Sequence, residues 1–233
     1  MFGLNVESDR SLGFPVGSGG DAGKMPTVGL RESGGLSDTV DDESLGRLVQ
    51  SGVDLQYGGW LFRLDLEAEA IEYERRPVGE LELPFEHVLE RMILPLYATI
   101  RNSTYLCVHA SALVIDGRAW LFLGDTGAGK STTVYELTRR TDAKLAADEM
   151  TVVDVETLVL HPGSPALRLD KERAIPEATD EGAIHPEIEK RWFRFASEWI
   201  ADRPAPIAGV VVLEPGTTDE VRRLSGGERL TRL

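Results

Sequence analysis

Hydrophobic residues alternate with polar or small residues in the first third of the chain, a pattern typical of half-buried strands. The residues from Phe2 to Val6 follow it. Between Gly58 and Arg76 the alternation occurs twice, which predicts a β-hairpin. Residues 13–35, rich in Gly, Ser, Asp and Pro, predict loops. The pattern as a whole predicts a small β-rich domain over residues 1–84.

The hydrophobic period changes to three and four residues after this region. The stretch from Pro84 to Arg101 has this period and predicts an amphipathic helix that begins at the proline. Pro95 lies inside it and predicts a kink. Near the other end of the chain, five apolar residues predict an aromatic-rich helical segment: Trp192, Phe193, Phe195, Trp199 and Ile200. Packing in the core or between subunits is the simpler interpretation of that segment, and a peptide-binding face is the alternative.

Short apolar runs in the middle of the chain predict three strands. They are Tyr105–Val108, Ala112–Ile115 and Ala119–Leu123. The dipeptide Asp116-Gly117 joins the last two, and this is the strongest signal for a two-residue hairpin. The third strand is therefore expected to have an antiparallel neighbour, whereas typical GTPase and RecA-type cores are mostly parallel at this place.

Three further elements are expected downstream. Residues 132–140 predict a helix, residues 151–154 a strand, and the run Ile207–Leu213 a buried strand that ends at Glu214-Pro215-Gly216. The sequence LSGGE at residues 224–228 resembles the signature of ABC transporter ATPases. Its order relative to the other motifs is reversed in this chain, so we interpret it as a turn that caps a short final helix.

The sequence GDTGAGKST contains a complete phosphate-binding loop of the form G-x-x-x-x-G-K-[ST], between a predicted strand and a predicted helix. Glycines allow successive backbone N–H groups to point at an anion, and the helix N-terminus adds its positive dipole end. The lysine of such a loop reaches the β- and γ-phosphates, and the serine hydroxyl binds Mg²⁺. The nucleotide-binding residues are therefore expected to be Gly124, Asp125, Thr126, Gly127, Ala128, Gly129, Lys130, Ser131 and Thr132.

Two adjacent acids, Asp148 and Glu149, follow the predicted helix at the end of an apolar run. An acid at this place meets Mg²⁺ or the nucleophile in many phosphoryl-transfer sites. Neighbouring strand residues face opposite ways, so the pair can share one site only if the chain bends there. A solvated strand-end carboxylate is the alternative for Glu149. His109 is either a packing residue or a catalytic one, and Arg168 either contacts a phosphate or pairs with Asp170.

Composition narrows the class of protein. The formal net charge of −14 argues against nucleic-acid binding, which needs a basic surface. No apolar run approaches the length of a membrane span, and the N-terminal residues do not resemble a secretory signal. The single cysteine, Cys107, excludes an internal disulfide. A cytoplasmic location without membrane partners is therefore expected.

The segment from Val108 to Asp154 resembles the C-terminal catalytic domain of HPr kinase/phosphorylase and, more closely, the HPr-kinase-like serine kinases. It has their order of a histidine, a hairpin, the glycine-rich loop and an acidic pair. The stretches HPGSPALRLD and IAGVVVLEPG also resemble segments of these relatives, so the resemblance covers about residues 104–216. It implies an α/β fold: a P-loop kinase core with a mixed sheet over residues 85–233, preceded by the small β-rich domain.

The resemblance also implies roles for individual residues. Lys130 and Ser131 would bind phosphate and Mg²⁺. Asp148 would accept the proton of an acceptor serine, Glu149 would help to hold Mg²⁺, and His109 would lie near the reacting phosphate. In P-loop ATPases with such a pair, the first acid binds the metal and the second orients the nucleophile. The catalytic residues implied are thus Asp148, His109 and Lys130, and the metal ligands are Ser131, Glu149 and Asp148.

The chain departs from the family pattern at three places. It has Asp-Glu where the family has two aspartates, Thr132 where the family has a glutamate, and no arginine- and glycine-rich second signature. The expected activity is ATP- and Mg²⁺-dependent phosphoryl transfer to a hydroxyl group, in particular that of a serine, of a protein, peptide or small molecule. A nucleotide-binding switch or ATPase module is the alternative. A homo-oligomer is possible, and the missing guanine-reading motif favours ATP over GTP.

Overall fold

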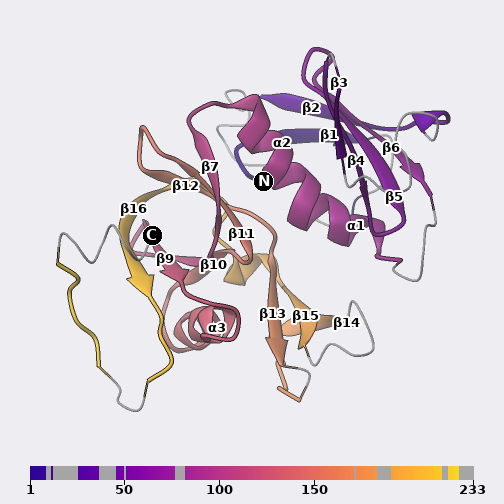
Figure 1. Ribbon diagram of the computed structural model, residues 1–233. Coiled ribbons are helices and arrows are strands. Elements are labelled where there is room, and N and C mark those ends of the chain that lie inside the picture. Colours follow the sequence, from indigo (N-terminus) through magenta and orange to yellow (C-terminus); the bar gives the residue numbers. More distant parts are fainter. Residues whose placement is uncertain are drawn as a thin grey trace.

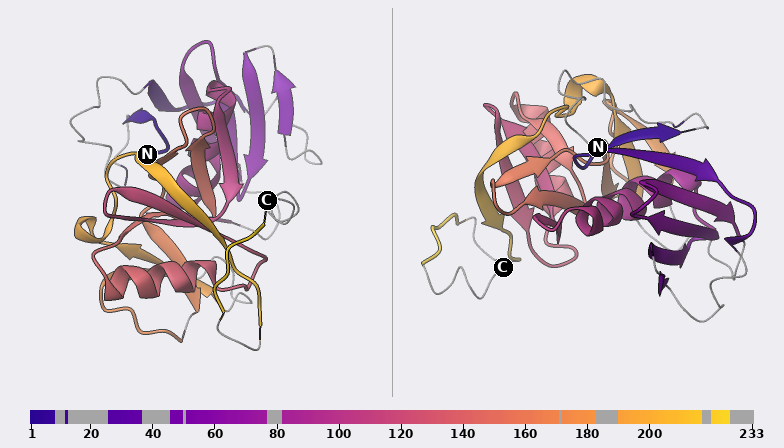
Figure 2. Two further views of the ribbon diagram at one scale, coloured as in Figure 1. Left: turned by 90° about the vertical axis from the view of Figure 1, so that its left-hand side faces the viewer. Right: turned by 90° about the horizontal axis from the view of Figure 1, so that it is seen from above.

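The computed structural model describes residues 1–8, 12, 26–36, 46–49, 51–76, 82–170, 172–182, 190–216 and 220–225. The protein is a mixed α/β fold that consists mostly of sheet and has few helices (Figure 1). The described strands form sheets of six, seven and three strands. The first helix lies between the six-stranded sheet and the seven-stranded sheet, as the two further views in Figure 2 show.

The N-terminal region is β-rich, as predicted. Its six-stranded sheet has the order β1-β2-β6-β5-β4-β3. The strands are β1 (Asn5–Ser8), β2 (Thr27–Glu32), β3 (Gly46–Val49), β4 (Gly52–Tyr57), β5 (Trp60–Asp65) and β6 (Ala70–Arg75). The predicted hairpin is confirmed, since β5 and β6 pair in antiparallel register with Phe62 opposite Tyr73.

The prediction of loops throughout residues 13–35 is wrong for its last part. Residues 27–32 form β2, which pairs in parallel with both β1 and β6. The physical reason is that Val28 and Leu30 are fully buried while Gly29 between them is only half-buried. Two buried residues were too few to stand out among the many glycines and serines before them. Residues 13–25 lie outside the described residues.

Gly52 lies where a side chain has no room. A methyl group on it would be 1.8 Å from the backbone oxygen of Leu64 on the paired strand. We expect Gly52→Ala to lower the free energy of unfolding by about 1–3 kcal/mol, because a backbone oxygen cannot move without disturbing the ladder. Gly34→Ala is the control, since no atom lies within 4 Å of its added carbon. Urea unfolding of both variants measures the difference, and equal stabilities would contradict the expectation.

The predicted helix is confirmed and begins directly after Pro84. It comprises α1 (Phe85–Val88), a π-helical turn (Leu89–Ile93) and α2 (Leu94–Arg101). Pro95 has no N–H to donate and its ring clashes with the carbonyl one turn earlier. The wider π turn directly before it accommodates this defect. The irregularity that Pro95 predicts is thus a change of helical type in the preceding turn.

One hydrophobic core joins this helix to both large sheets. Phe85, Leu89 and Ile93 pack in the same buried cluster as Phe62 of β5 and Val152 of the seven-stranded sheet. The boundary predicted between residues 84 and 85 separates the β-rich region from the helix in the sequence. In the structure, the β-rich region and the helix pack in the same hydrophobic core. The domain boundary itself stays a prediction.

The seven-stranded sheet has the order β10-β8-β9-β16-β12-β11-β7. Its strands are β7 (Tyr105–His109), β8 (Ser111–Ile115), β9 (Arg118–Leu123), β10 (Lys144–Ala147), β11 (Met150–Asp154), β12 (Val159–His161) and β16 (Ala205–Val212). The predicted turn between β8 and β9 is confirmed: Asp116 and Gly117 have φ of 51° and 71°, the left-handed values of a type I′ turn. Strand β9 is antiparallel to β8, as predicted, and parallel to β16.

Strand β16 is less buried than predicted for residues 207–213. Val210 is 44% exposed, and most of the strand is only half-buried. A run of consecutive apolar residues predicts burial on both faces, but solvent reaches part of one face here. The strand itself is confirmed, in parallel register with β9.

The three-stranded sheet is antiparallel and has the order β13-β15-β14. Its strands are β13 (Ala166–Asp170), β14 (Ala178–Gly182) and β15 (Lys190–Phe195). The prediction of a helical segment at residues 192–200 is therefore wrong, apart from a single 3₁₀ turn at Ser197–Trp199. Aromatic residues favour strands, and consecutive buried residues here point to opposite faces of a sheet that is covered on both sides. The expected core packing of Trp192, Phe193 and Phe195 is confirmed.

The sequence predicts a short helix after residue 225 and no membrane span. Leu224 and Ser225 have no regular secondary structure, and residues 226–233, where the final helix was predicted, lie outside the described residues. Within the described part of the chain, none of the helices has both the length and the apolar character needed to cross a bilayer.

Candidate nucleotide-binding and catalytic site

The glycine-rich loop connects strand β9 to helix α3 (Lys130–Arg140), the context that the motif requires. Gly124, Gly127 and Gly129 have φ of 141°, 90° and 95°, values that side chains disfavour. Gly124 also lies against the chain that follows β16, where an added carbon would be 2.5 Å from the Leu213 oxygen. The helix begins two residues earlier than predicted, so the loop runs directly into its first turn.

Lys130 is the first residue of α3 and is 8% exposed. Its ammonium group donates to the backbone oxygens of Gly124 (2.7 Å) and Asp125 (3.2 Å). Both partners belong to the loop, so the positive charge lies within the curve of the loop. A phosphate bound by the loop would meet this charge.

The acidic pair lies in a bend between β10 and β11. Glu149 has a φ of 64°, so the chain turns sharply between the two strands. Because of this turn, both carboxylates line one cleft, and the requirement for a bend is met. A non-glycine residue in this left-handed region costs energy and persists only where its surroundings hold it there, and such residues are frequent at functional sites. The backbone oxygen of Glu149 is held by Ala110 N–H at 3.2 Å.

Asp148 is a buried acid with several hydrogen-bond donors. One carboxylate oxygen accepts from the hydroxyls of Ser131 (2.9 Å) and Ser111. The other accepts from the backbone N–H of Arg168 at 2.9 Å. Burial raises the pKa of the Asp148 carboxyl, while the hydrogen bonds from Ser111, Arg168 and Ser131 act in the opposite direction. Ser131 and Asp148, both predicted site residues, are thus in direct contact.

Glu149 and His109 are neighbours in the lining of this cleft. The Glu149 carboxylate pairs with the Arg168 guanidinium at 2.9 Å, so Arg168 pairs with Glu149 and not with Asp170. His109 Nδ1 lies 3.1 Å from the Glu149 backbone oxygen. A carbonyl oxygen only accepts, so Nδ1 carries the hydrogen and Nε2 remains available to a ligand.

These side chains line a cleft of about 230 Å³. Nine predicted site residues line it: His109, Thr126, Gly127, Gly129, Lys130, Ser131, Thr132, Asp148 and Glu149. The other predicted loop residues, Gly124, Asp125 and Ala128, form the loop itself without lining the cleft. Four further residues complete the wall: Arg168, Leu169, Asp170 and Lys190. Sequence reasoning singled out Arg168 only as an ambiguous candidate and missed Ser111 and Lys190, whose positions depend on strand pairing.

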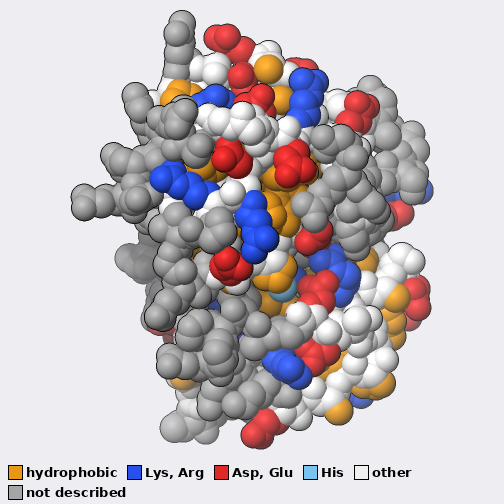
Figure 3. Space-filling view, turned by 90° about the vertical axis from the view of Figure 1, so that its right-hand side faces the viewer, with side chains coloured by type: hydrophobic (Ala, Val, Ile, Leu, Met, Phe, Trp, Pro, Cys, Tyr) orange, Lys and Arg blue, Asp and Glu red, His pale blue; other side chains and the backbone are white. Residues whose placement is uncertain are grey.

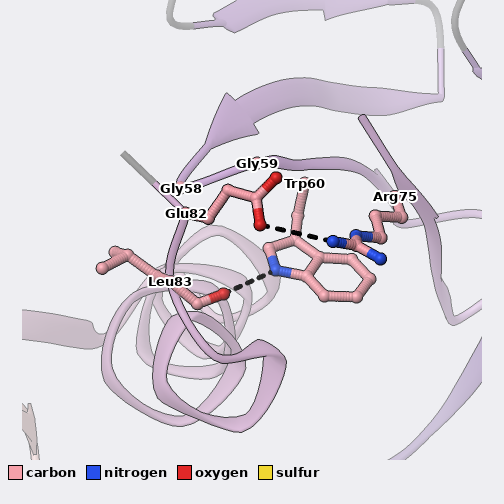
Figure 4. Close-up of a pocket in the computed structure, with 6 residues that line it drawn as sticks. All are labelled: Gly58, Gly59, Trp60, Arg75, Glu82 and Leu83. Atoms are coloured by element: carbon pink, nitrogen blue, oxygen red, sulfur yellow. Dashed lines mark hydrogen bonds and ion pairs between the residues drawn. The ribbon is translucent and has the colours of Figure 1, made fainter. Parts of the chain in front are cut away.

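A second, smaller recess of about 140 Å³ lies beside the β5–β6 hairpin (Figure 4). The Trp60 indole N–H donates to the Leu83 oxygen at 2.9 Å, and Arg75 pairs with Glu82 at 3.3 Å. These contacts fasten the hairpin to the residues that lead into α1. The recess has no side chain suited to catalysis beyond this exposed ion pair, so we assign it a structural role.

No protein-family model matches the chain, and no curated protein matches it significantly.

Proposed function

We propose that the protein is an ATP-dependent kinase that transfers a phosphoryl group to a hydroxyl group, such as that of a serine, on a protein, peptide or small molecule. The observation that carries the proposal is the contact between Ser131 of the glycine-rich loop and Asp148 at the end of the next strand. The order of strand, loop, helix and acidic strand end supports a P-loop kinase core with a mixed sheet. We also propose that this core has the fold of the HPr-kinase-like proteins.

The chain supplies the groups that hold a nucleotide. Phosphoryl transfer needs charge neutralisation and positioning more than covalent help. The N–H groups of the loop and of the first turn of α3 would bind the phosphates, and Lys130 would add a full positive charge beside them. Thr126 and Thr132 of the same motif also line the cleft and offer hydroxyl groups to a nucleotide.

The residues present fit a magnesium ion. Mg²⁺ is usually held by one or two carboxylates together with substrate phosphates and waters, so a small set of protein ligands is enough. Ser131 and Asp148 would hold it, and Glu149 lies next to them. When bound, the ion neutralises charge that develops on the phosphate oxygens. Among the described residues there is no group of three or more His, Cys, Asp or Glu side chains that could hold a metal without phosphate ligands.

The contacts of Asp148 and Glu149 help to assign which acid binds Mg²⁺ and which accepts the proton of the acceptor hydroxyl. The family resemblance implies Asp148 as the base and Glu149 as a metal ligand. Asp148, however, is 3% exposed and already accepts hydrogen bonds from Ser131, Ser111 and Arg168. The Glu149 side chain is 28% exposed. These differences support the reverse assignment, with Asp148 at the metal and Glu149 near the acceptor hydroxyl.

Intact-mass analysis tests the proposed transfer. Purified protein incubated with Mg-ATP and candidate acceptors is expected to add the mass of one phosphate to an acceptor or to itself. Calorimetric titration is expected to show ATP bound more tightly than GTP. Binding of Mg-ATP without transfer to any acceptor would favour the alternative, a nucleotide-dependent switch or ATPase module. A preference for GTP would contradict the kinase proposal.

A further inference from the structure

A second cluster of charged side chains lies between the first helix and the three-stranded sheet. Glu90 and Arg91 come from the π-helical turn, and Glu181 and Arg194 come from β14 and β15. Arg194 donates to Glu90 at 2.8 Å, and Arg91 donates to Glu181 at 2.9 Å. Charged side chains of both signs are interspersed on this side of the molecule (Figure 3).

The cluster contains an unusual number of buried nitrogens without a hydrogen-bond partner, although His87 Nε2 lies 3.8 Å from the Glu181 carboxylate. Of the nine buried side-chain atoms without a hydrogen-bond partner among the described residues, five belong to it. They are His87 Nε2, Arg91 Nε, Arg91 Nη1, Trp192 Nε1 and Arg194 Nη1. Native proteins leave few buried polar groups unsatisfied, and each such group calls for a specific explanation, such as a bound ion or water.

The chemistry of these atoms indicates what would satisfy them. All five are nitrogens, and the arginine and tryptophan nitrogens can only donate. A guest that only accepts hydrogen bonds, such as an oxyanion, therefore complements them better than water, which must also place its own hydrogens. Arginine in particular is suited to phosphate because its planar group donates from several nitrogens at once.

Contacts with the Trp192 ring also hold the side chains of Arg91 and His87 in position to bind an oxyanion. The Arg91 guanidinium carbon lies 3.5 Å from the centre of the Trp192 ring, so the cation stacks on the indole. The His87 ring centre is 5.8 Å from that of Trp192. Burial lowers the pKa of Arg91 to about 9, so the group remains charged at neutral pH, and a bound anion would compensate part of the cost of burying it.

The cluster reaches solvent at its edge, whereas the five unpartnered nitrogens are themselves buried. The side chains of Arg194 and Glu181 are 19% and 21% exposed, so the edge of the cluster reaches solvent. Phe193 and Phe195 on the same strand pack in the cluster that contains Val134 of α3, whereas Trp192 and Arg194 alternate with them. The cluster therefore occupies the opposite face of this sheet from α3.

We infer that Arg91, Arg194, Trp192 and His87 form a binding site for a phosphate-type oxyanion, separate from the glycine-rich loop. The oxyanion is either free inorganic phosphate or a phosphoryl group carried by a larger ligand. This inference does not depend on the proposed kinase activity.

Titration calorimetry with inorganic phosphate tests the site in the full chain. Because phosphate could also bind the glycine-rich loop, the experiment starts from Lys130→Ala, in which binding at this second site is expected to persist. In that background, Arg91→Met is expected to weaken phosphate binding by about tenfold or more, the worth of one charge-assisted hydrogen bond. Arg140→Met is the matched control, because it removes an exposed arginine on α3 that pairs with Glu136.

A second variant keeps the test decisive if Arg91→Met does not fold. Trp192→Phe removes one donor and preserves an aromatic ring, and a several-fold weaker affinity for phosphate is expected. The same titrations with O-phosphoserine distinguish the two sources, since tighter binding of one probe identifies it as the closer match. Loss of all phosphate binding in Lys130→Ala would overturn the inference. So would equal affinities in the parent, Arg91→Met and Trp192→Phe.

Discussion

Lys130→Ala is expected to weaken binding of Mg-ATP by about 100-fold or more and to abolish phosphoryl transfer. The variant loses a charge-assisted contact to phosphate, and each 1.4 kcal/mol corresponds to a factor of ten in affinity. The fold should remain intact, because the hydrogen bonds of the ammonium group within the described part of the chain go to two loop oxygens, those of Gly124 and Asp125. Calorimetric titration measures the affinity, and thermal unfolding by circular dichroism checks the fold.

Lys144→Ala is the control for this prediction. Lys144 lies on β10, is exposed, and donates to the backbone oxygen of Glu198, so its removal changes the net charge equally but does not touch the cleft. Its nucleotide affinity should equal that of the parent. If Lys130→Ala binds Mg-ATP and transfers phosphate as the parent does, the glycine-rich loop is not the working site.

The second large effect is expected from substitutions of the acidic pair, Asp148 and Glu149. Glu149→Gln is expected to reduce transfer by about 10²–10⁴-fold with little change in nucleotide affinity, because an amide cannot take up the proton of the acceptor hydroxyl. Asp148→Asn is expected to weaken Mg²⁺-dependent nucleotide binding instead, and raised Mg²⁺ should partly restore it. Measurement of transfer rates and Mg-ATP affinities over a range of Mg²⁺ concentrations separates the two effects.

The assignment implied by the family resemblance predicts the opposite pattern. In that case Asp148→Asn would lose transfer while keeping its metal dependence, and Mg²⁺ would rescue Glu149→Gln. Asp170→Asn serves as the control, since this acid also lines the cleft and its side chain accepts from the Glu172 N–H at 3.1 Å. A comparable loss in all three variants would indicate a general effect of charge in the cleft rather than separate roles.

Local pattern was enough to predict the elements that depend on neighbouring residues. The β5–β6 hairpin, the helix after Pro84 and the turn at Asp116-Gly117 each follow from a period or a turn signal within about 20 residues. The aromatic segment at residues 192–200 is predicted as a helix, whereas residues 190–195 form a strand, because residues buried on both faces of a strand leave no alternation to detect. The burial of β16 was overestimated for a related reason, since a continuous apolar run does not reveal which face stays open to solvent.

For the candidate site too, the sequence predicts the features that depend on neighbouring residues but not those that depend on tertiary packing. Motif spacing predicted the loop and the acidic pair, and it gave the condition that the chain must bend between Asp148 and Glu149. It could not place Ser111, Arg168 and Lys190, which lie in other strands and reach the cleft only through tertiary packing. Nor could it predict that Arg168 contacts both acids, one through its backbone N–H and the other through its side chain.

The pairing of β9 with β16 has a consequence for the order of events during synthesis. The strand that leads into the glycine-rich loop ends at Leu123, yet its parallel partner begins at Ala205, more than 80 residues later in the chain. The Leu213 N–H donates to the Leu123 oxygen at 2.8 Å, directly before Gly124. A ribosome must therefore extend the chain from Leu123 to Leu213 before this side of the loop is supported, and such distant pairings form slowly. A nascent chain arrested before residue 205 would carry the complete motif without the neighbour that supports its first glycine.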